Sequence, residues 1–441
     1  MDQLESALRS LTTEVCRQLE GQGIPKRPVW TVVTPTDSAP YVALDADRPA
    51  LSDLRYSLTL GLLKLPEYAV SADAVENDAE LREGIIVDAG GYLHKPERIN
   101  STRALLTNFL WRYLREGEQI DWDEPRFVET FNELRAELRR KTVLLHTTLP
   151  LSNLKMDIAE VNFGDELKLL PASIHELERW INRDQSLPPL GASLPLWNTR
   201  YVDRPAVLHA RQIVVGRPPP IDLHAIAEAT ARVNSDQAIT ALRLVMNAPV
   251  SIIFQEQDTE GFMAFGGGGT SWRNSTAPLG PVAKLDRENA TQVNQVWQLL
   301  QASPNMGLLR VPLRRWESSL LRASFEDRLI DAWVGLEALL LAGQEGELSY
   351  RAAVRLAEFL GTNGVERKAI YDVTKVSYAW RSVIVHALSS KKVAKRLPLE
   401  EVVRVTTEHL RSALLKVLKL PGRFDPNKLE SDLLSRESGQ A

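Results

Sequence analysis

Residues 378–386 read Tyr-Ala-Trp-Arg-Ser-Val-Ile-Val-His and place Arg381 and His386 in an otherwise apolar stretch of helical period. A guanidinium binds a phosphodiester through two parallel hydrogen bonds. An imidazole that titrates near neutrality moves the proton of a hydroxyl or of a leaving oxygen, and this chemistry requires no metal. The stretch therefore predicts a catalytic pair for a phosphodiester on a helix.

Two stretches upstream accompany this one. Residues 325–339 read FEDRLIDAWVGLEAL, and residues 350–357 read YRAAVRLA. Together with residues 378–386 they resemble the Apea-like branch of the HEPN superfamily. The resemblance implies a small helical bundle that forms a homodimer and, where the arginine and histidine are present, cuts RNA, often in prokaryotic defence against phage. It covers roughly the last third of the chain and leaves the earlier residues without an assignment.

Length and composition indicate an ordinary globular protein with more than one domain. The chain has 441 residues, of which 44% are hydrophobic and 25% charged, and this length predicts two or three domains. The single cysteine, Cys16, excludes an internal disulfide framework and fits a reducing cytosol. The N-terminus lacks a basic region followed by an apolar run, and no long apolar stretch follows, so we expect a cytoplasmic protein without a membrane span.

Positive charge is concentrated around the Arg-His pair. Residues 365–425 contain 13 Lys and Arg against 6 Asp and Glu, a net charge of +7, whereas the whole chain has −4. A basic segment on an acidic chain suits a polyanion. Solvated helix faces are the alternative for any single lysine. We predict RNA binding by the cluster that follows His386, which consists of Lys391, Lys392, Lys395 and Arg396.

The predicted fold class is α+β, with a mixed N-terminal region followed by an all-α, HEPN-like C-terminal bundle. Residues 1–140 form a helix-rich region, with helices at 4–19, 51–63, 101–113 and 127–140 and strands at 29–33 and 85–87. Residues 141–283 form an α+β region. Its predicted strands are 142–149, 157–163, 166–170, 207–215, 250–254 and 262–265, with a hairpin turn at Gly164-Asp165 and helices at 174–181 and 223–246.

The bundle is predicted for residues 284–425, and residues 426–441 are a tail. Its helices are expected at 288–302, 313–323, 326–341, 350–360, 366–388 and 400–418.

Helical geometry separates the two catalytic candidates. Arg381 and His386 point roughly 140° apart, because each residue turns the helix by about 100°. Ser382 and His386 are only about 40° apart, so Ser382 is the expected hydrogen-bond neighbour of the imidazole and the third catalytic residue. Either the long arginine curls round to reach the same phosphate, or two copies of the helix complete the site across a dimer. The family resemblance favours the dimer.

Glu337 and Tyr378 are predicted to support this site. Glu337 has Trp333 and Leu340 as helical neighbours, and a carboxylate on such an apolar face requires a cationic partner. Arg381 would be a functional partner, whereas Arg351 or Arg355 would make a purely structural pair, which is the more common situation.

The other candidate sites are weaker. His386 alone also fits a core histidine beside Val383 and Val385, and the six remaining histidines have no ligand spacing. We therefore predict no metal and no cofactor. The run at 266–271, Gly-Gly-Gly-Gly-Thr-Ser, lacks the Gly-Lys-Ser/Thr ending of a phosphate-binding loop and is interpreted as a flexible loop.

These observations predict a metal-independent endoribonuclease that forms 2′,3′-cyclic phosphate ends, with a role in antiphage defence or toxin-like RNA cleavage. The N-terminal region would sense or recruit a phage-derived or protein trigger. The alternative is a non-catalytic module that binds nucleic acid or dimerises, or the scaffold of a defence complex.

Overall fold

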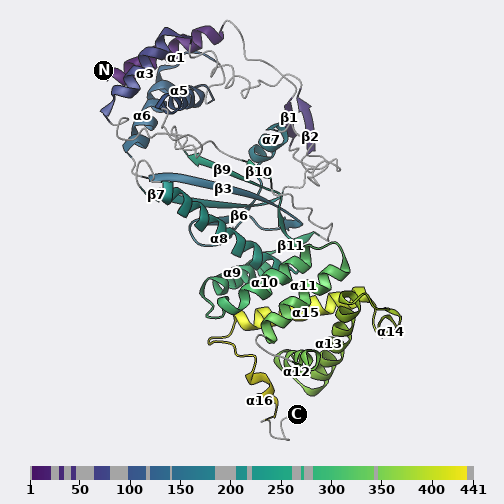
Figure 1. Cartoon of the computed structure of the whole chain (residues 1–441). Helices are drawn as coiled ribbons and strands as arrows, with labels where there is room; N and C mark the ends of the chain where they lie inside the picture. Colours follow the sequence, from purple (N-terminus) through teal and green to yellow (C-terminus); the bar gives the residue numbers. More distant parts are fainter. Residues whose placement is uncertain are drawn as a thin grey trace. The chain divides into compact units, whose positions relative to one another are not determined.

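The computed structural model describes residues 2–20, 29–33, 41–45, 64–79, 98–115, 120–139, 142–183, 205–215, 221–260, 270–272, 282–341 and 346–434 (Figure 1). The chain divides into two compact units. Unit 1 comprises Met1–Pro150, Gly164–Asn234 and Ile252–Asn274, and unit 2 comprises Leu151–Phe163, Ser235–Ser251 and Ser275–Ala441.

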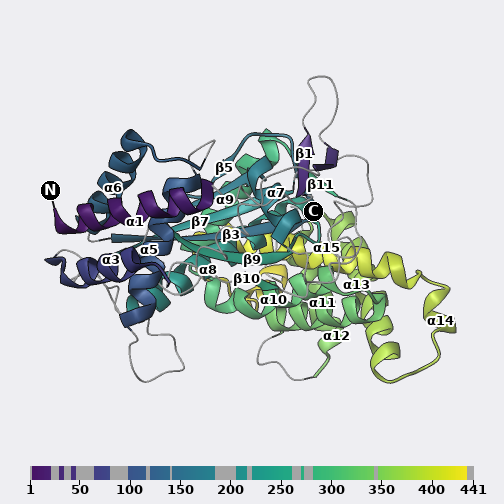
Figure 2. The same ribbon diagram turned by 90° about the horizontal axis from the view of Figure 1, so that it is seen from above.

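Unit 1 contains a cluster of four helices, which lie together in both views (Figures 1 and 2). They are α1 (Gln3–Glu20), α3 (Pro66–Asn77), α5 (Arg98–Arg115) and α6 (Glu124–Arg139). Along α1, Leu4, Leu8, Leu11 and Val15 recur at helical spacing and are at most 2% exposed. They pack into one core with residues of the other three helices, such as Phe109. The amphipathic period of these helices thus determines the fold of this part.

Unit 1 also contains an antiparallel sheet in which β10, β9, β3, β7 and β6 follow one another. The strands are β3 (Thr142–Ser152), β6 (Leu167–Pro171), β7 (Ala206–Val215), β9 (Phe254–Glu260) and β10 (Thr270–Trp272). In the pairing of β6 with β7, Leu169 lies opposite Leu208, and both are fully buried. Gly164 has a φ of 82°, the left-handed backbone that the predicted turn requires.

The remaining elements of the mixed region are short strands and two helices. The strands β1 (Val29–Val33) and β2 (Tyr41–Asp45) pair antiparallel. The helices are α7 (Ile174–Arg183) and α8 (Ile221–Met246). In unit 2, β4 (Leu154–Met156) and β11 (Ala283–Leu285) pair in parallel. Two further short strands are β5 (Val161–Asn162) and β8 (Ser251–Ile252).

Unit 2 is otherwise helical. Its helices after residue 286 are α9 (Arg287–Ala302), α10 (Met306–Leu321), α11 (Phe325–Leu340), α12 (Leu348–Leu360), α13 (Gly364–Val385), α14 (Lys391–Ala394), α15 (Leu399–Leu418) and α16 (Lys428–Leu434). They are green to yellow in Figure 1. Trp316 of α10, Trp333 of α11 and Leu410 of α15 are fully buried. Gly335 allows these three helices to approach closely, since a Cβ there would lie 2.7 Å from the Leu410 side chain.

The predicted start of α10 at residue 313 is wrong by two turns. The prediction placed Pro312 before the helix because proline lacks the N–H that an internal helical position donates. In the structure, Pro312 is inside the helix and buried. Leu309 and Leu313 flank it and are buried as well. The packing of these side chains against neighbouring helices outweighs the proline's local cost.

Several other boundaries differ from the predictions. The helix predicted to reach residue 388 ends at Val385. The predicted strand 157–163 is reduced to Val161–Asn162, and α16 lies in the predicted tail. The fold class α+β is confirmed, with the sheet in the first part and helices in the last, whereas the three-part division stays a prediction. The elements predicted at 51–63, 85–87 and 262–265, and the glycines 266–269, lie outside the described residues.

Candidate functional site

Helix α13 carries the predicted catalytic stretch. Asn363 caps its N-terminus, because its side chain accepts a hydrogen bond from the Glu366 N–H at 2.9 Å. One face of the helix is fixed in the unit by the buried side chains of Thr374, Ser377 and Trp380. The predicted site residues lie beside this face or at the helix end.

Arg381 is held on two sides. Its guanidinium lies 3.4 Å from Glu337 Oε1 of α11, and both side chains are about one-quarter exposed. The guanidinium carbon also lies 5.6 Å from the centre of the Tyr378 ring, one turn earlier, which is a cation–π distance. Within the described residues, the Arg381 guanidinium and Glu337 Oε1 share no hydrogen bond of good geometry. The arginine is therefore positioned while its donors are still available to a phosphate.

Glu337 pairs with Arg381 and not with Arg355, one of the two structural partners predicted from the sequence. Arg355 of α12 is 2% exposed but turns to other groups. It donates to the Leu340 carbonyl at 2.6 Å and to Glu430 Oε1 at 2.8 Å, and its third bond reaches Asn427 Oδ1 at 3.2 Å. Arg355 therefore supplies a hydrogen bond to a carbonyl at the C-terminal end of α11 and links α12 to α16. These contacts extend unit 2 beyond residue 425, where the predicted bundle ended.

A buried relay positions Tyr378, and the sequence did not reveal it. The Trp333 ring meets the Tyr378 ring edge-on at 5.1 Å. The Trp333 indole N–H donates to Ser377 Oγ at 2.8 Å, and Ser377 Oγ lies 2.6 Å from Thr406 Oγ1 of α15. Three helices are thus joined beneath the arginine.

His386 lies at the end of α13 and is exposed. Its own N–H donates to the Ser382 carbonyl, after which Ala387 adopts φ +50° and the Leu388 N–H bonds the Val383 carbonyl at 2.9 Å. This is a Schellman ending, in which the left-handed residue stops the helix. The alternative of a core histidine is therefore wrong. The helix end presents the imidazole to solvent.

Ser382 is close to His386 only through the backbone. The bond between them is the one from the His386 N–H to the Ser382 carbonyl. In the part of the chain that the structure describes, no hydrogen bond joins the Ser382 hydroxyl to the imidazole, and no contact joins Arg381 to His386. The catalytic roles of the three residues stay predictions.

The predicted RNA-binding cations lie on the connection after His386. Lys391, Lys392, Lys395 and Arg396 are all exposed on or beside α14. This connection returns to the bundle where the Trp380 indole N–H donates to the Leu397 carbonyl at 3.0 Å. Figures 1 and 2 show α14 on the segment that joins α13 to α15. The four charges are therefore available to a polyanion.

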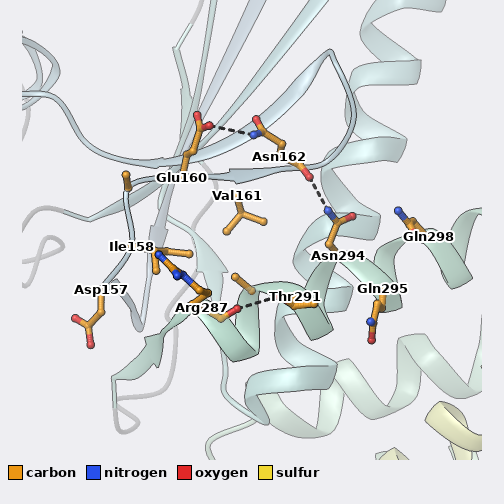
Figure 3. A pocket seen from close by; sticks show the side chains of 12 residues that line it. Asp157, Ile158, Glu160, Val161, Asn162, Arg287, Thr291, Asn294, Gln295 and Gln298 are labelled. Carbon is orange, nitrogen blue, oxygen red and sulfur yellow. Dashed lines mark hydrogen bonds between the residues drawn. The ribbon is translucent and has the colours of Figure 1, made fainter.

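A separate polar groove of about 750 Å³ lies between residues 157–162 and α9 (Figure 3). Eight of the twelve residues that line it have hydrogen-bonding side chains. Asn294 donates to the Asn162 carbonyl at 3.0 Å, and the Asn162 amide bonds Glu160 at 3.1 Å. The Asn294 bond ties the short β5 segment to α9, and none of the predicted site residues lines the groove.

Of the six other histidines, the structure describes the side chains of His146, His209 and His409. Burial lowers the pKa of His409 on α15, and His209 lies 3.5 Å from Glu176. His94 and the side chains of His175 and His224 lie outside the described part.

Among the described residues, no three His, Cys, Asp or Glu side chains are grouped as metal ligands would be. No described helix has the length and apolar character needed to cross a bilayer. No family model, curated protein or solved structure matches the chain.

Proposed function

We propose that this protein is a metal-independent endoribonuclease whose active site is formed by Arg381 and His386. The proposal rests on one observation: the same helix carries an arginine held in place by its neighbours and a histidine exposed to solvent. Arg381 is held by Glu337 and Tyr378, and His386 ends the same helix in solvent. A guanidinium can bind the phosphoryl oxygens and an imidazole can transfer protons, and these are two tasks in phosphodiester transfer to an internal hydroxyl.

The proposed reaction is an internal transfer. The ribose 2′-oxygen attacks phosphorus and loses its proton to an imidazole, while the bond from phosphorus to the 5′-oxygen breaks and that oxygen gains a proton. The products are a 2′,3′-cyclic phosphate and a free 5′-hydroxyl. Arg381 stabilises the negative charge that increases on the phosphoryl oxygens in the transition state. Need for the 2′-hydroxyl explains why RNA rather than DNA is the substrate.

The active form is proposed to be a homodimer through the helical unit. Within one chain, Arg381 lies along α13 and His386 at its end, without a contact between them. A two-fold axis presents the same patch twice, so two copies of this helix end supply one imidazole as base and another as acid. Lys391, Lys392, Lys395 and Arg396 contribute attraction for the RNA backbone rather than chemistry. In this proposal unit 1 senses or recruits a protein or phage-derived trigger in antiphage defence.

The test compares purified full-length variants on a single-stranded RNA with known ends. Arg381→Ala and His386→Ala are each expected to lower the cleavage rate by about 10² to 10⁴-fold. Arg404→Ala is the matched control, because Arg404 is a helix-surface arginine paired with Glu401 on α15. It should cleave at the unchanged rate. Circular dichroism must show that each variant is folded.

Product chemistry separates this mechanism from others. Excess chelator should leave the rate unchanged, and one 2′-deoxy residue at the cut should block cleavage there. Products with 5′-phosphate ends, or a folded His386→Ala variant that cuts at the original rate, would refute the assigned site. RNA binding without cleavage by the unaltered protein under any trigger would favour the non-catalytic binding module.

A further inference from the structure

One face of α13 carries a regular series of cationic and aromatic side chains. Lys368, Tyr371, Lys375 and Tyr378 follow one another at spacings of three and four residues. Such spacings place side chains along one face of a helix. The next positions on this face are Ser382 and His386. We call these four residues, together with Tyr350, the α13 stripe.

Two aromatic members of the stripe, Tyr350 and Tyr371, are accessible and contact each other. Tyr350 of α12 is 52% exposed, and its ring meets the half-buried Tyr371 ring at 6.4 Å in a T-shaped contact. The Lys368 ammonium lies 6.0 Å from the Tyr371 ring. Lys375 donates to Ser349 Oγ at 2.9 Å and is thereby oriented beside these rings. The stripe thus has ring faces next to fixed positive charges.

Acidic residues are absent from the sequence that follows Asp372 on this helix. Between Asp372 and Glu400 there is no Asp or Glu, whereas the same segment contains six Lys and Arg. Asp372 forms an ion pair with Lys368, and both side chains are more than half exposed. Because exposed pairs of this kind contribute little, a phosphate competes readily for Lys368.

We propose that the α13 stripe is a binding track for single-stranded RNA that leads to His386. Unpaired bases stack on Tyr371 and Tyr350, and the backbone phosphates contact Lys368 and Lys375. Lys368 and His386 are 18 residues apart, which corresponds to about 27 Å along a helix. This length suits roughly four nucleotides, the lower end of known single-strand sites. The inference rests on the proposed function, since it names the form of RNA that reaches the cutting site.

The exposed tyrosine rings indicate that the bound RNA is single-stranded. A base can stack on a tyrosine only when it is unpaired, and stacking is tolerant of sequence because every base has a π-face. A duplex offers its backbone but hides the base faces. The stripe should therefore prefer unpaired RNA, with little preference for sequence.

The test measures binding in a chain that does not cut. Full-length His386→Ala protein is titrated into fluorescently labelled 12-nucleotide RNA, and anisotropy gives Kd as a function of salt. Tyr371→Ala should weaken binding about fivefold or more, as loss of a stacked base does. Tyr371→Phe should bind like the parent, because it keeps the ring. Tyr350→Ala should behave like Tyr371→Ala.

Loss of a lysine should change the salt dependence of RNA binding. Lys375→Ala should reduce the slope of log K against log salt by about 0.7, the value for one phosphate contact on a single strand. Lys284→Ala, an exposed lysine on β11, is the control and should leave both Kd and slope unchanged. A blunt-ended RNA duplex, which has no unpaired bases, should bind more weakly than the open strand.

The possible outcomes distinguish a failure of the proposed RNA-binding track from a failure of the proposed catalytic residues. Unchanged Kd in Tyr371→Ala and Tyr350→Ala, or equal affinity for the blunt duplex and the open strand, would overturn the track even if His386 is catalytic. Weaker binding in the tyrosine variants would support the track even if the catalytic variants keep their activity. In that case the assigned cutting residues fail and the binding surface stands.

Discussion

Removing the Ser377 hydroxyl should destabilise the helical unit strongly, because two buried groups depend on it. Ser377 Oγ accepts from the Trp333 indole N–H at 2.8 Å and lies 2.6 Å from Thr406 Oγ1. Trp333, Ser377 and Thr406 are at most 3% exposed, so water cannot replace the lost oxygen. Each buried polar group left without a partner costs about 1–3 kcal/mol. Ser377→Ala should therefore lower the free energy of unfolding by about 2–4 kcal/mol.

Urea unfolding followed by circular dichroism measures this effect. With a slope of about 2–3 kcal/mol per molar urea, the midpoint should fall by about 1 M while the slope stays unchanged. Ser318→Ala is the matched control, since the Ser318 hydroxyl bonds only the Arg314 carbonyl on an exposed helix surface. Its midpoint should move little.

A double-mutant cycle makes the reasoning refutable. In a Trp333→Phe background the indole donor is already absent, so Ser377→Ala should cost less than it does in the unaltered chain. A midpoint for Ser377→Ala equal to that of the Ser318→Ala control, or an equal cost in both backgrounds, would show that the relay does not stabilise the unit.

Three further predictions concern helix contacts, a helix end and a buried histidine. Gly335→Ala should lower the unfolding free energy by about 1–3 kcal/mol, because its Cβ would lie 2.7 Å from the Leu410 side chain. Gly307→Ala is the control and should not destabilise the protein, since a Cβ there meets nothing within 4 Å. Equal denaturant midpoints for the two variants would contradict the close packing at Gly335. Ala387→Gly should raise the unfolding free energy by about 1 kcal/mol, since Ala387 has φ +50° and an L side chain disfavours that conformation; a lower thermal midpoint would argue against the Schellman ending. Burial lowers the pKa of His409, so this imidazole binds a proton more readily in the unfolded chain, and the protein loses stability as the pH falls below about 6.5. His409→Gln should therefore flatten the dependence of stability on pH in this range. An unchanged dependence would show that another group causes the loss of stability in acid.

The sequence predicted most of the helices, because a long amphipathic period is a strong signal. The predicted helices at 4–19, 326–341 and 400–418 agree with α1, α11 and α15 to within one residue at each end. The exceptions arise where tertiary contacts override a local rule. Pro312 stays inside α10 because its neighbours are buried, and α13 stops at Val385 because Ala387 turns left-handed without a glycine.

The candidate site was only partly accessible from the sequence. The apolar neighbours of Glu337 correctly indicated a cationic partner, but periodicity cannot choose among arginines on other helices. The choice depends on helix packing, which brings Arg381 to Glu337 and directs Arg355 to Glu430. The Trp333–Ser377–Thr406 relay joins side chains up to 73 residues apart, and no local pattern encodes such a contact.

The contacts of Arg355 also set an order of events during synthesis. The core of α1, α3, α5 and α6 is complete once Leu134 has been made, whereas Arg355 obtains its last partner only with Glu430. At about 5–20 residues per second, a ribosome needs roughly 15–60 s for the residues in between. Unit 2 therefore reaches its final state well after the four-helix core can form. A nascent chain interrupted before residue 427 therefore lacks two of the three hydrogen-bond partners of the buried Arg355.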